Sequence, residues 1–297
     1  MNIIRILKKG AVETASSYKL LLTVWIITLV MIMFVALPLR SSFRTVFGNS
    51  MAMEKLSDGF DMGLTGDMGE AFGQLMSSAT TGGFLLLLAG FLMFTFFAGG
   101  LFARFTTAWG GLKVSAFLKA SAHNFVPFLL IALLMGLITG VYTILLFGIP
   151  IGMALAFSGG SSPLSGLLKV LFVLWVLGLP VWLFAADASR RWIAATGSRK
   201  VFRALREGFR AFWKRFWISY MTVLVILILN VVFVSGSMCF TAVSMPDKGI
   251  MIFLFFLVTQ LLFIVRLFLK AWRYAAVSEL ALLPERRYLV LPQRDTE

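Results

Sequence analysis

The chain has 297 residues, of which 60% are hydrophobic and 13% are charged, and its formal net charge at pH 7 is +14. Soluble proteins average about 45–50% apolar and about 25% charged residues, so a water-soluble domain of this length could not bury so much apolar surface. The composition therefore predicts a membrane protein. The basic residues cluster beside apolar segments, as topology signals do, which argues against nucleic acid as a partner.

Six segments are long and apolar enough to cross a bilayer as helices, which takes about 20 residues each. They are residues 20–38, 83–103, 126–148, 164–186, 217–240 and 250–270. Each is expected to be helical, because lipid does not tolerate unpaired backbone groups and the sequence lacks the alternating pattern of a membrane barrel. We predict an all-α, six-transmembrane-helix bundle that forms a single membrane domain over residues 1–283, with a tail over residues 284–297.

The distribution of basic residues predicts that both termini, and thus the tail, lie in the cytoplasm. With the N-terminus inside, 22 Lys and Arg residues belong to that side and four to the other, a strong positive-inside bias. The first span is expected to be retained, since its apolar run is too long for a signal peptide. The chain has no N-x-[ST] sequon, which fits a bacterial cytoplasmic membrane.

The segment between the fourth and fifth spans, residues 190–216, holds nine of the 27 basic residues. Val201, Leu205, Phe209, Phe212 and Phe216 recur there at intervals of three or four, which predicts an amphipathic helix in the membrane interface. Each basic residue near anionic head groups contributes about 1 kcal/mol to membrane attraction. We therefore expect membrane lipids, especially anionic ones, as partners. A calmodulin-type partner would fit the same pattern.

Self-comparison at an offset of 87 residues indicates an internal repeat. Arg104, Gly110 and Lys113 align with Arg191, Gly197 and Lys200, so a span is followed in both copies by a glycine turn and a surface helix. Arg273-Tyr274 gives a weaker third echo of Arg104-Phe105 and Arg191-Trp192, and residues 2–20 resemble another surface helix. We predict three units of surface helix plus helical hairpin, related by an axis along the membrane normal.

The repeat and the surface helix supply the candidate lipid-contacting residues. Arginine reaches phosphate from the end of a span, and an aromatic neighbour favours the head-group level. The residues expected to contact head groups are Arg104, Lys113, Arg191, Lys200, Arg203, Arg206, Arg210 and Arg273.

The segment between the first two spans is the only one outside with clustered acids: Glu54, Asp58, Asp61, Asp67 and Glu70. Oxygen ligands of this kind could bind a cation, but the spacing is not that of an EF-hand. Asp67 and Glu70 match a capping box, which predicts a helix start at Asp67. We favour a structural role for these acids and expect no metal site and no cofactor.

Polar groups inside spans are costly and often functional. Asn230 and Gln260 lie near the middle of the fifth and sixth spans, and Arg266 shares a face with Lys270. The two amides are candidates for a hydrogen bond between helices or for a permeation path. Asp187 is expected to form an interfacial ion pair with Arg190 or Arg191.

Other features point to packing rather than chemistry. Gly136 and Gly140 form a G-x-x-x-G motif in the third span, and Gly90, Gly99 and Gly100 lie in the second; such small residues permit close helix approach. Cys239 is the single cysteine, which excludes a thiolate cluster and an intrachain disulfide. His123 is the single histidine, and we expect it to lie on a membrane-surface helix. No P-loop, H-E-x-x-H or G-x-S-x-G motif occurs.

The six-span layout and the segments GLKVSAFLKASAHNF and GSRKVFRALREGFRAF resemble a loose class of bacterial integral membrane proteins. That class includes the membrane domain attached to some glycerophosphoryl diester phosphodiesterases. The resemblance covers spans two to six and implies no catalytic residues in this chain. We expect a non-enzymatic, lipid-contacting scaffold or accessory subunit of a membrane assembly. The alternatives are a transporter or channel component that uses spans five and six, and a lipid-modifying enzyme.

Overall fold

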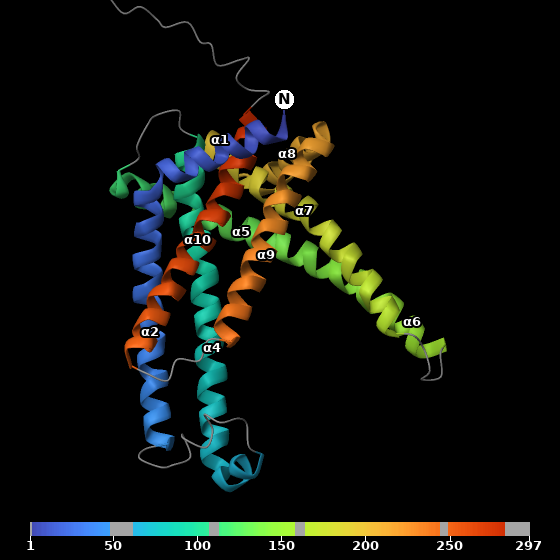
Figure 1. Ribbon diagram of the computed structural model, residues 1–297. Helices are drawn as coiled ribbons and strands as arrows, with labels where there is room; N and C mark the ends of the chain where they lie inside the picture. The colour runs from blue at the N-terminus through green and yellow to red at the C-terminus, as the bar shows by residue number, and fades with distance from the viewer. Residues whose placement is uncertain (1, 48–61, 107–112, 158–163, 244–248, 283–297) are drawn as a thin grey trace, which may run out of the picture. The chain divides into compact units, whose positions relative to one another are not determined.

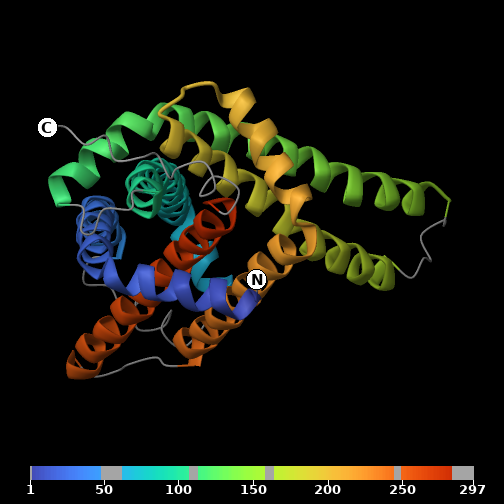
Figure 2. The ribbon, with the colours of Figure 1, turned by 90° about the horizontal axis from the view of Figure 1, so that it is seen from above.

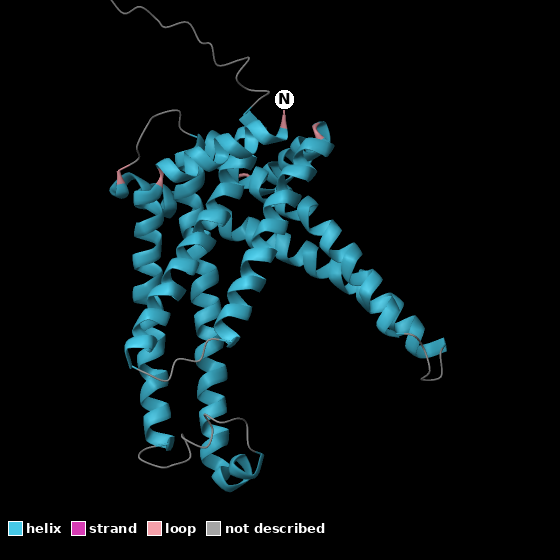
Figure 3. Ribbon diagram, in the orientation of Figure 1, coloured by secondary structure: helices cyan, strands magenta, loops and turns pink. Residues whose placement is uncertain are grey.

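The computed structural model describes residues 2–47, 62–106, 113–157, 164–243 and 249–282, and within these ranges every element is a helix (Figures 1 and 3). The helices in chain order are α1 Ile3–Ser16, α2 Tyr18–Phe47, α4 Met62–Thr106, α5 Val114–Thr143, the π-helical turn η1 Ile144–Gly148, α6 Ile149–Phe157, α7 Leu164–Thr196, α8 Val201–Lys214, α9 Phe216–Val243 and α10 Gly249–Leu282.

The six predicted spans are confirmed as six helices long and apolar enough to cross a membrane. They are Tyr18–Pro38, Met76–Thr106, Val114–Met153, Gly166–Thr196, Phe216–Ala242 and Gly249–Ala281. In the third, fifth and sixth spans only 11% of the most apolar window is buried in the protein. Surface that is both apolar and uncovered by protein is stable in lipid rather than in water. The chain is thus a multi-pass membrane protein by the length and composition of its helices.

Two compact units make up the chain, Thr23–Phe94 and Met1–Leu22 together with Thr95–Glu297. The first unit holds most of α2 and the N-terminal part of α4. Because α4 begins at Met62, Asp67 lies inside a helix, and the predicted helix start at Asp67 is wrong. No proline interrupts residues 62–106, so the helix continues N-terminally past the capping sequence.

In the second unit, five helices meet in one apolar core. Ile6 of α1, Phe184 of α7, Phe212 of α8, Val223 of α9 and Val277 of α10 are all buried in it. Figure 2 shows the short helix α1 crossing α10. The core therefore gathers short surface helices around the ends of long apolar ones.

The short helices α1 and α8 end in the same way. The amide of Ser17 donates to Thr14 O at 3.0 Å, and the amide of Arg215 donates to Phe212 O at 3.2 Å. Each break follows a buried glycine by seven residues, Gly10 in α1 and Gly208 in α8. At the other end of α8, Gly197 has a φ of +63°, the left-handed conformation that glycine adopts without strain. The glycine turn predicted there is confirmed.

The predicted break between a surface helix and the third span is absent. Residues 113–125 and the span form one helix, α5, which contains Pro127 and continues through η1 into α6. The C-terminal part of α5 pairs with α7 (Figures 1 and 2). Tyr142 Oη donates to Leu174 O at 3.1 Å, and Trp175 Nε1 donates to Thr143 Oγ1 at 3.0 Å. Hydroxyl and indole groups thus fix the pairing of these two helices.

Three further contacts join helix ends through small residues. Near their C-terminal ends, α4, α7 and α10 each carry a buried aromatic–alanine–small triplet: Phe97-Ala98-Gly99, Phe184-Ala185-Ala186 and Tyr274-Ala275-Ala276. A Cβ added to Gly99 would lie 3.1 Å from Ser121 O of α5, one on Gly208 2.6 Å from Ala185 O, and one on Gly10 3.1 Å from Ala276 N. The small residues therefore let each backbone approach its neighbour closely.

The predicted G-x-x-x-G contact is not made. A Cβ on Gly136, Gly140 or Gly90 would meet no atom within 4 Å, whereas one on Gly100 would collide with Phe117 and Ser121. Close approach therefore occurs at the end of the second span rather than in the third. A small-residue spacing permits contact but does not supply the partner helix.

Candidate functional site

A buried ion cluster joins α7 to α10. The Asp187 side chain is fully buried, and its Oδ2 accepts a hydrogen bond from Arg273 Nε at 2.7 Å. Its Oδ1 accepts a second one from Arg190 Nη1 at 3.3 Å. The predicted pair with Arg190 is confirmed, and the longer-range partner is Arg273. Removing one member would leave a buried charge uncompensated, which makes this a strong structural constraint.

Aromatic contacts connect the ion cluster to α4. Arg273 Cζ lies 5.4 Å from the ring centroid of Tyr274, and that ring lies 4.7 Å from the ring of Phe102. Tyr274 and Phe102 are both buried. The predicted third copy of the arginine–aromatic pair, Arg273-Tyr274, therefore lies at a different position along its helix from the other two copies. Tyr274 occupies the triplet position of Phe97 and Phe184, whereas Arg104 and Arg191 follow their triplet aromatics by seven residues.

A cavity of about 200 Å³ lies between α7, α8, α9 and α10, beside this cluster. Four cations and one carboxylate line it: Arg191, Arg210, Lys214, Arg215 and Glu207. The apolar lining residues are Phe184, Ala188, Trp192, Ala211, Leu280 and Ala281, and the polar residue Ser219 also lines the cavity. We call this cavity the cationic pocket.

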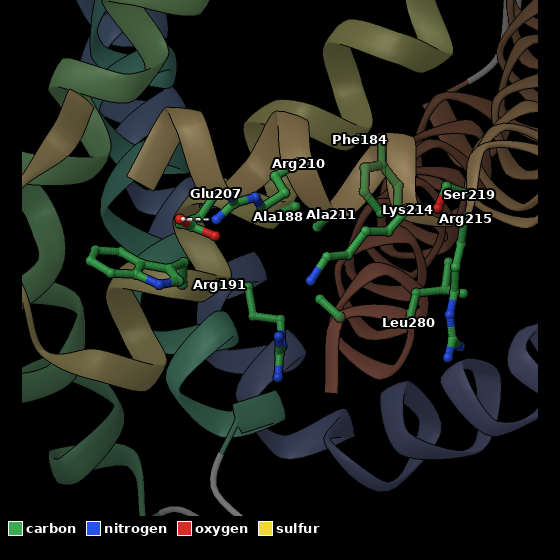
Figure 4. Close-up of a pocket in the computed structure, with 12 residues that line it drawn as sticks. Phe184, Ala188, Arg191, Glu207, Arg210, Ala211, Lys214, Arg215, Ser219 and Leu280 are labelled. Carbon is green, nitrogen blue, oxygen red and sulfur yellow. Dashed lines mark hydrogen bonds and ion pairs between the residues drawn. The ribbon is translucent and has the colours of Figure 1, made fainter. Parts of the chain in front are cut away.

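The charged residues of the cationic pocket differ in burial. Arg191 is only 4% exposed, whereas Arg210, Lys214 and Arg215 are exposed. Figure 4 shows the Arg210–Glu207 pair at one end of the lining and Arg215 at the other, with Arg191 and Lys214 between them. Arg210 Nη1 lies 3.4 Å from Glu207 Oε1. The lining thus carries a net positive charge beside apolar surface.

The helix α8 presents two different faces. Its inner face, Val201, Ala204, Leu205, Gly208 and Phe212, is buried against the core. On the outer face, basic side chains alternate with large apolar ones, and Phe202 and Trp213 are 79% and 67% exposed. Trp217, at the start of α9, is 69% exposed. Indole rings among basic residues are typical of a membrane interface.

The predicted head-group residues fall into two groups. Lys113, Lys200, Arg203, Arg206 and Arg210 are exposed. Arg104 is half-buried, Arg191 is buried, and Arg273 is held by Asp187. The second group lies within the helix packing.

The polar residues of spans five and six lie apart from the pocket lining. Asn230 of α9 and Gln260 of α10 are half-buried, and Arg266 is exposed. They stay candidates for the transporter alternative.

Three of the acids between the first two spans, Glu54, Asp58 and Asp61, lie outside the described residues. Within the part of the chain that the structure describes, no group of three His, Cys, Asp or Glu side chains could hold a metal ion. His123 and Cys239 are both exposed.

Comparisons of the chain with protein-family models, with curated proteins and with solved structures found no match. The class of the protein, a multi-pass helical membrane protein, therefore rests on its six apolar helices. The resemblance to the phosphodiesterase-associated membrane domain stays a prediction.

Sequence reasoning missed the cationic pocket. Lys214, Arg215 and Glu207 were visible as charges, but only packing brings them beside Arg191 and Leu280. One signal in the sequence could have indicated the pocket. Lys214 and Arg215 are adjacent basic residues, and they lie where α8 ends and α9 begins.

Proposed function

We propose that this protein is a non-catalytic membrane scaffold, or an accessory subunit of a membrane assembly, that holds anionic lipids along one face of the membrane. The observation that carries the proposal is the outer face of α8, where the exposed aromatic residues Phe202 and Trp213 flank the exposed Arg203, Arg206 and Arg210. In water these rings would be costly to expose, whereas at a bilayer surface they enter the acyl boundary while the arginines meet phosphate.

Both termini and α8 lie on the cytoplasmic side in this proposal. The 22-to-4 distribution of basic residues supports that orientation. The test replaces Cys239 with serine and places a single cysteine at Arg206. A membrane-impermeant thiol reagent should label it only after the cells are opened, and labelling in intact cells would contradict the orientation.

The proposal includes three related units, in which each surface segment packs on the end of a span. The sequences Ile6-Leu7-Lys8, Phe117-Leu118-Lys119 and Ala204-Leu205-Arg206 precede Gly10, Ser121 and Gly208 by the same spacing. Gly10 contacts α10, Ser121 contacts α4 and Gly208 contacts α7, which supports a common unit. In this arrangement α1 is the surface helix that packs on α10, the last span. Leucine at each position should lower the unfolding temperature, whereas leucine at exposed Ala122 should not.

The lipid role is tested by extraction of the full chain into polymer nanodiscs, followed by analysis of the retained lipids. Anionic phospholipids should be enriched over the bulk membrane. The triple change Arg203→Gln, Arg206→Gln and Arg210→Gln should reduce that enrichment, because about 1 kcal/mol is lost with each charge. Bulk-like lipids around the unaltered protein would contradict the proposal.

A transport assay separates this role from the main alternative. Proteoliposomes that contain the purified chain should show no solute flux beyond empty vesicles. Flux that disappears with Asn230→Ala and Gln260→Ala would instead support a permeation path through spans five and six. Altered envelope lipids after Asp58→Ala and Asp61→Ala would support the enzyme alternative.

A further inference from the structure

From the cationic pocket we infer a specific binding site for a phosphate ester, one per chain, with the phosphodiester of an anionic phospholipid as its ligand. Buried Arg191 and the exposed Lys214 and Arg215 would supply donors to the phosphate oxygens. Lipid use rests on the proposed function, which places α8 at the membrane surface. The site is distinct from the outer face of α8, which attracts anionic lipid without selecting one molecule.

The charge balance of the lining favours an oxyanion. Its one carboxylate, Glu207, already pairs with Arg210 at 3.4 Å. Three further cations line the same cavity, and like charges that share a cavity raise the free energy of the empty site. A bound phosphate diester would bring a negative charge into this cavity. Buried Arg191 would contribute most, since its surroundings screen charge least.

The size and apolar lining indicate the part of the ligand that enters. Pockets for drug-sized molecules have volumes of about 300–1,000 Å³, whereas this one holds about 200 Å³. It therefore suits a phosphate with its adjoining glycerol rather than a whole lipid. Phe184, Ala188 and Leu280 offer apolar contact to the carbon part of that group. The acyl chains would continue into the bilayer beside the exposed ring of Trp213.

The test compares two double variants of the full chain that each remove two exposed positive charges. The pocket variant is Lys214→Gln with Arg215→Gln, and the matched control is Arg5→Gln with Lys8→Gln, two exposed residues of α1 that lie outside both the lining and the predicted head-group residues. Delipidated protein in neutral detergent is titrated with phosphatidylglycerol or phosphatidylcholine, and bound lipids are counted by native mass spectrometry. The pocket variant should bind phosphatidylglycerol about tenfold more weakly, and the control less than about twofold.

A gain-of-binding variant guards against misfolding. Glu207→Gln removes the one carboxylate among the described lining residues and the ion pair with Arg210, so phosphatidylglycerol should bind about threefold more tightly. Glycerol 3-phosphate forms the soluble arm, read by thermal stabilisation. If it protects the unaltered protein but not the pocket variant, while phosphatidylglycerol does not bind, the phosphate site stands with a soluble ligand.

Equal weakening in both double variants would overturn the pocket while leaving the surface role of α8 intact. Unchanged or weaker binding by Glu207→Gln would also overturn it. Equal binding of the two lipids by unaltered protein, with no protection by glycerol 3-phosphate, would exclude the site. Failure of the proposed function is recognised separately, by bulk-like lipids in the nanodisc extraction.

Discussion

Arg273 and Asp187 lie 86 positions apart in the sequence, yet Arg273 Nε and Asp187 Oδ2 are 2.7 Å apart. This bond connects the C-terminal parts of α7 and α10, and both helices line the cationic pocket. The ion pair therefore sets the spacing of two walls of the candidate phosphate site. Loss of the pair should affect stability first and phosphate binding second.

Asp187→Ala is expected to lower the free energy of unfolding by about 3–5 kcal/mol, because the half-buried Arg273 and Arg190 would lose their fully buried counter-charge. Thermal or denaturant unfolding in detergent measures the change. The matched control is Glu207→Gln, whose partner Arg210 is more than half exposed. Such a surface pair contributes at most about 1 kcal/mol. Similar losses in the two variants would contradict the buried role of Asp187.

Gly208→Ala is expected to destabilise the protein by about 1–3 kcal/mol, because the new Cβ would lie 2.6 Å from Ala185 O and backbone atoms yield little. Gly136→Ala should have the opposite sign, since that Cβ meets no atom within 4 Å and alanine is the better helix former by about 0.5–1 kcal/mol. Unfolding temperatures in one detergent compare them. A stable Gly208→Ala protein would show that α7 and α8 are further apart.

Charge reversal tests the docking of α1 on α10. Lys9 Nζ lies 2.6 Å from Glu279 Oε1, and the Glu279 side chain is only 9% exposed. Lys9→Glu should therefore destabilise the protein by about 1–3 kcal/mol through like charges at a partly buried site. Combining it with Glu279→Lys should recover most of the loss in the same unfolding assay. Additive losses in the double variant would show that the two residues do not interact.

Gly197→Ala is expected to cost about 1–2 kcal/mol, because a residue with a Cβ is strained at a φ of +63°. Gly197→Asn should cost less, since asparagine tolerates the left-handed region. No atom lies within 4 Å of a Cβ built at this position, so the loss would be conformational rather than steric. Thermal unfolding of the two variants checks the order, and an equal loss in both would contradict it.

The periodicity of α8 correctly predicted an amphipathic helix, because Val201, Leu205 and Phe212 repeat at helical spacing and share one face. We expected that apolar face to enter the membrane interface, but it packs against the protein core instead. The prediction of a separate surface helix before the third span was wrong, because the segment before Pro127 continues directly into the apolar part of the same helix, α5. A composition change does not end a helix unless the backbone is also interrupted. Gly136 and Gly140 make no close helix contact, because the spacing of small residues permits such a contact but does not determine whether another helix packs there.

By itself, the sequence determined that six helices are long and apolar enough to cross a membrane and that α8 is amphipathic. Both properties depend on local composition and on the cost of placing backbone and charge in lipid. Only the tertiary structure decided three contacts. Asp187 forms an ion pair with Arg273, Gly10 packs closely against the backbone of Ala276, and Arg191 lines the same cavity as Lys214. These contacts depend on how distant helices pack, and in lipid that packing is governed by shape and polar pairing rather than by hydrophobic pattern.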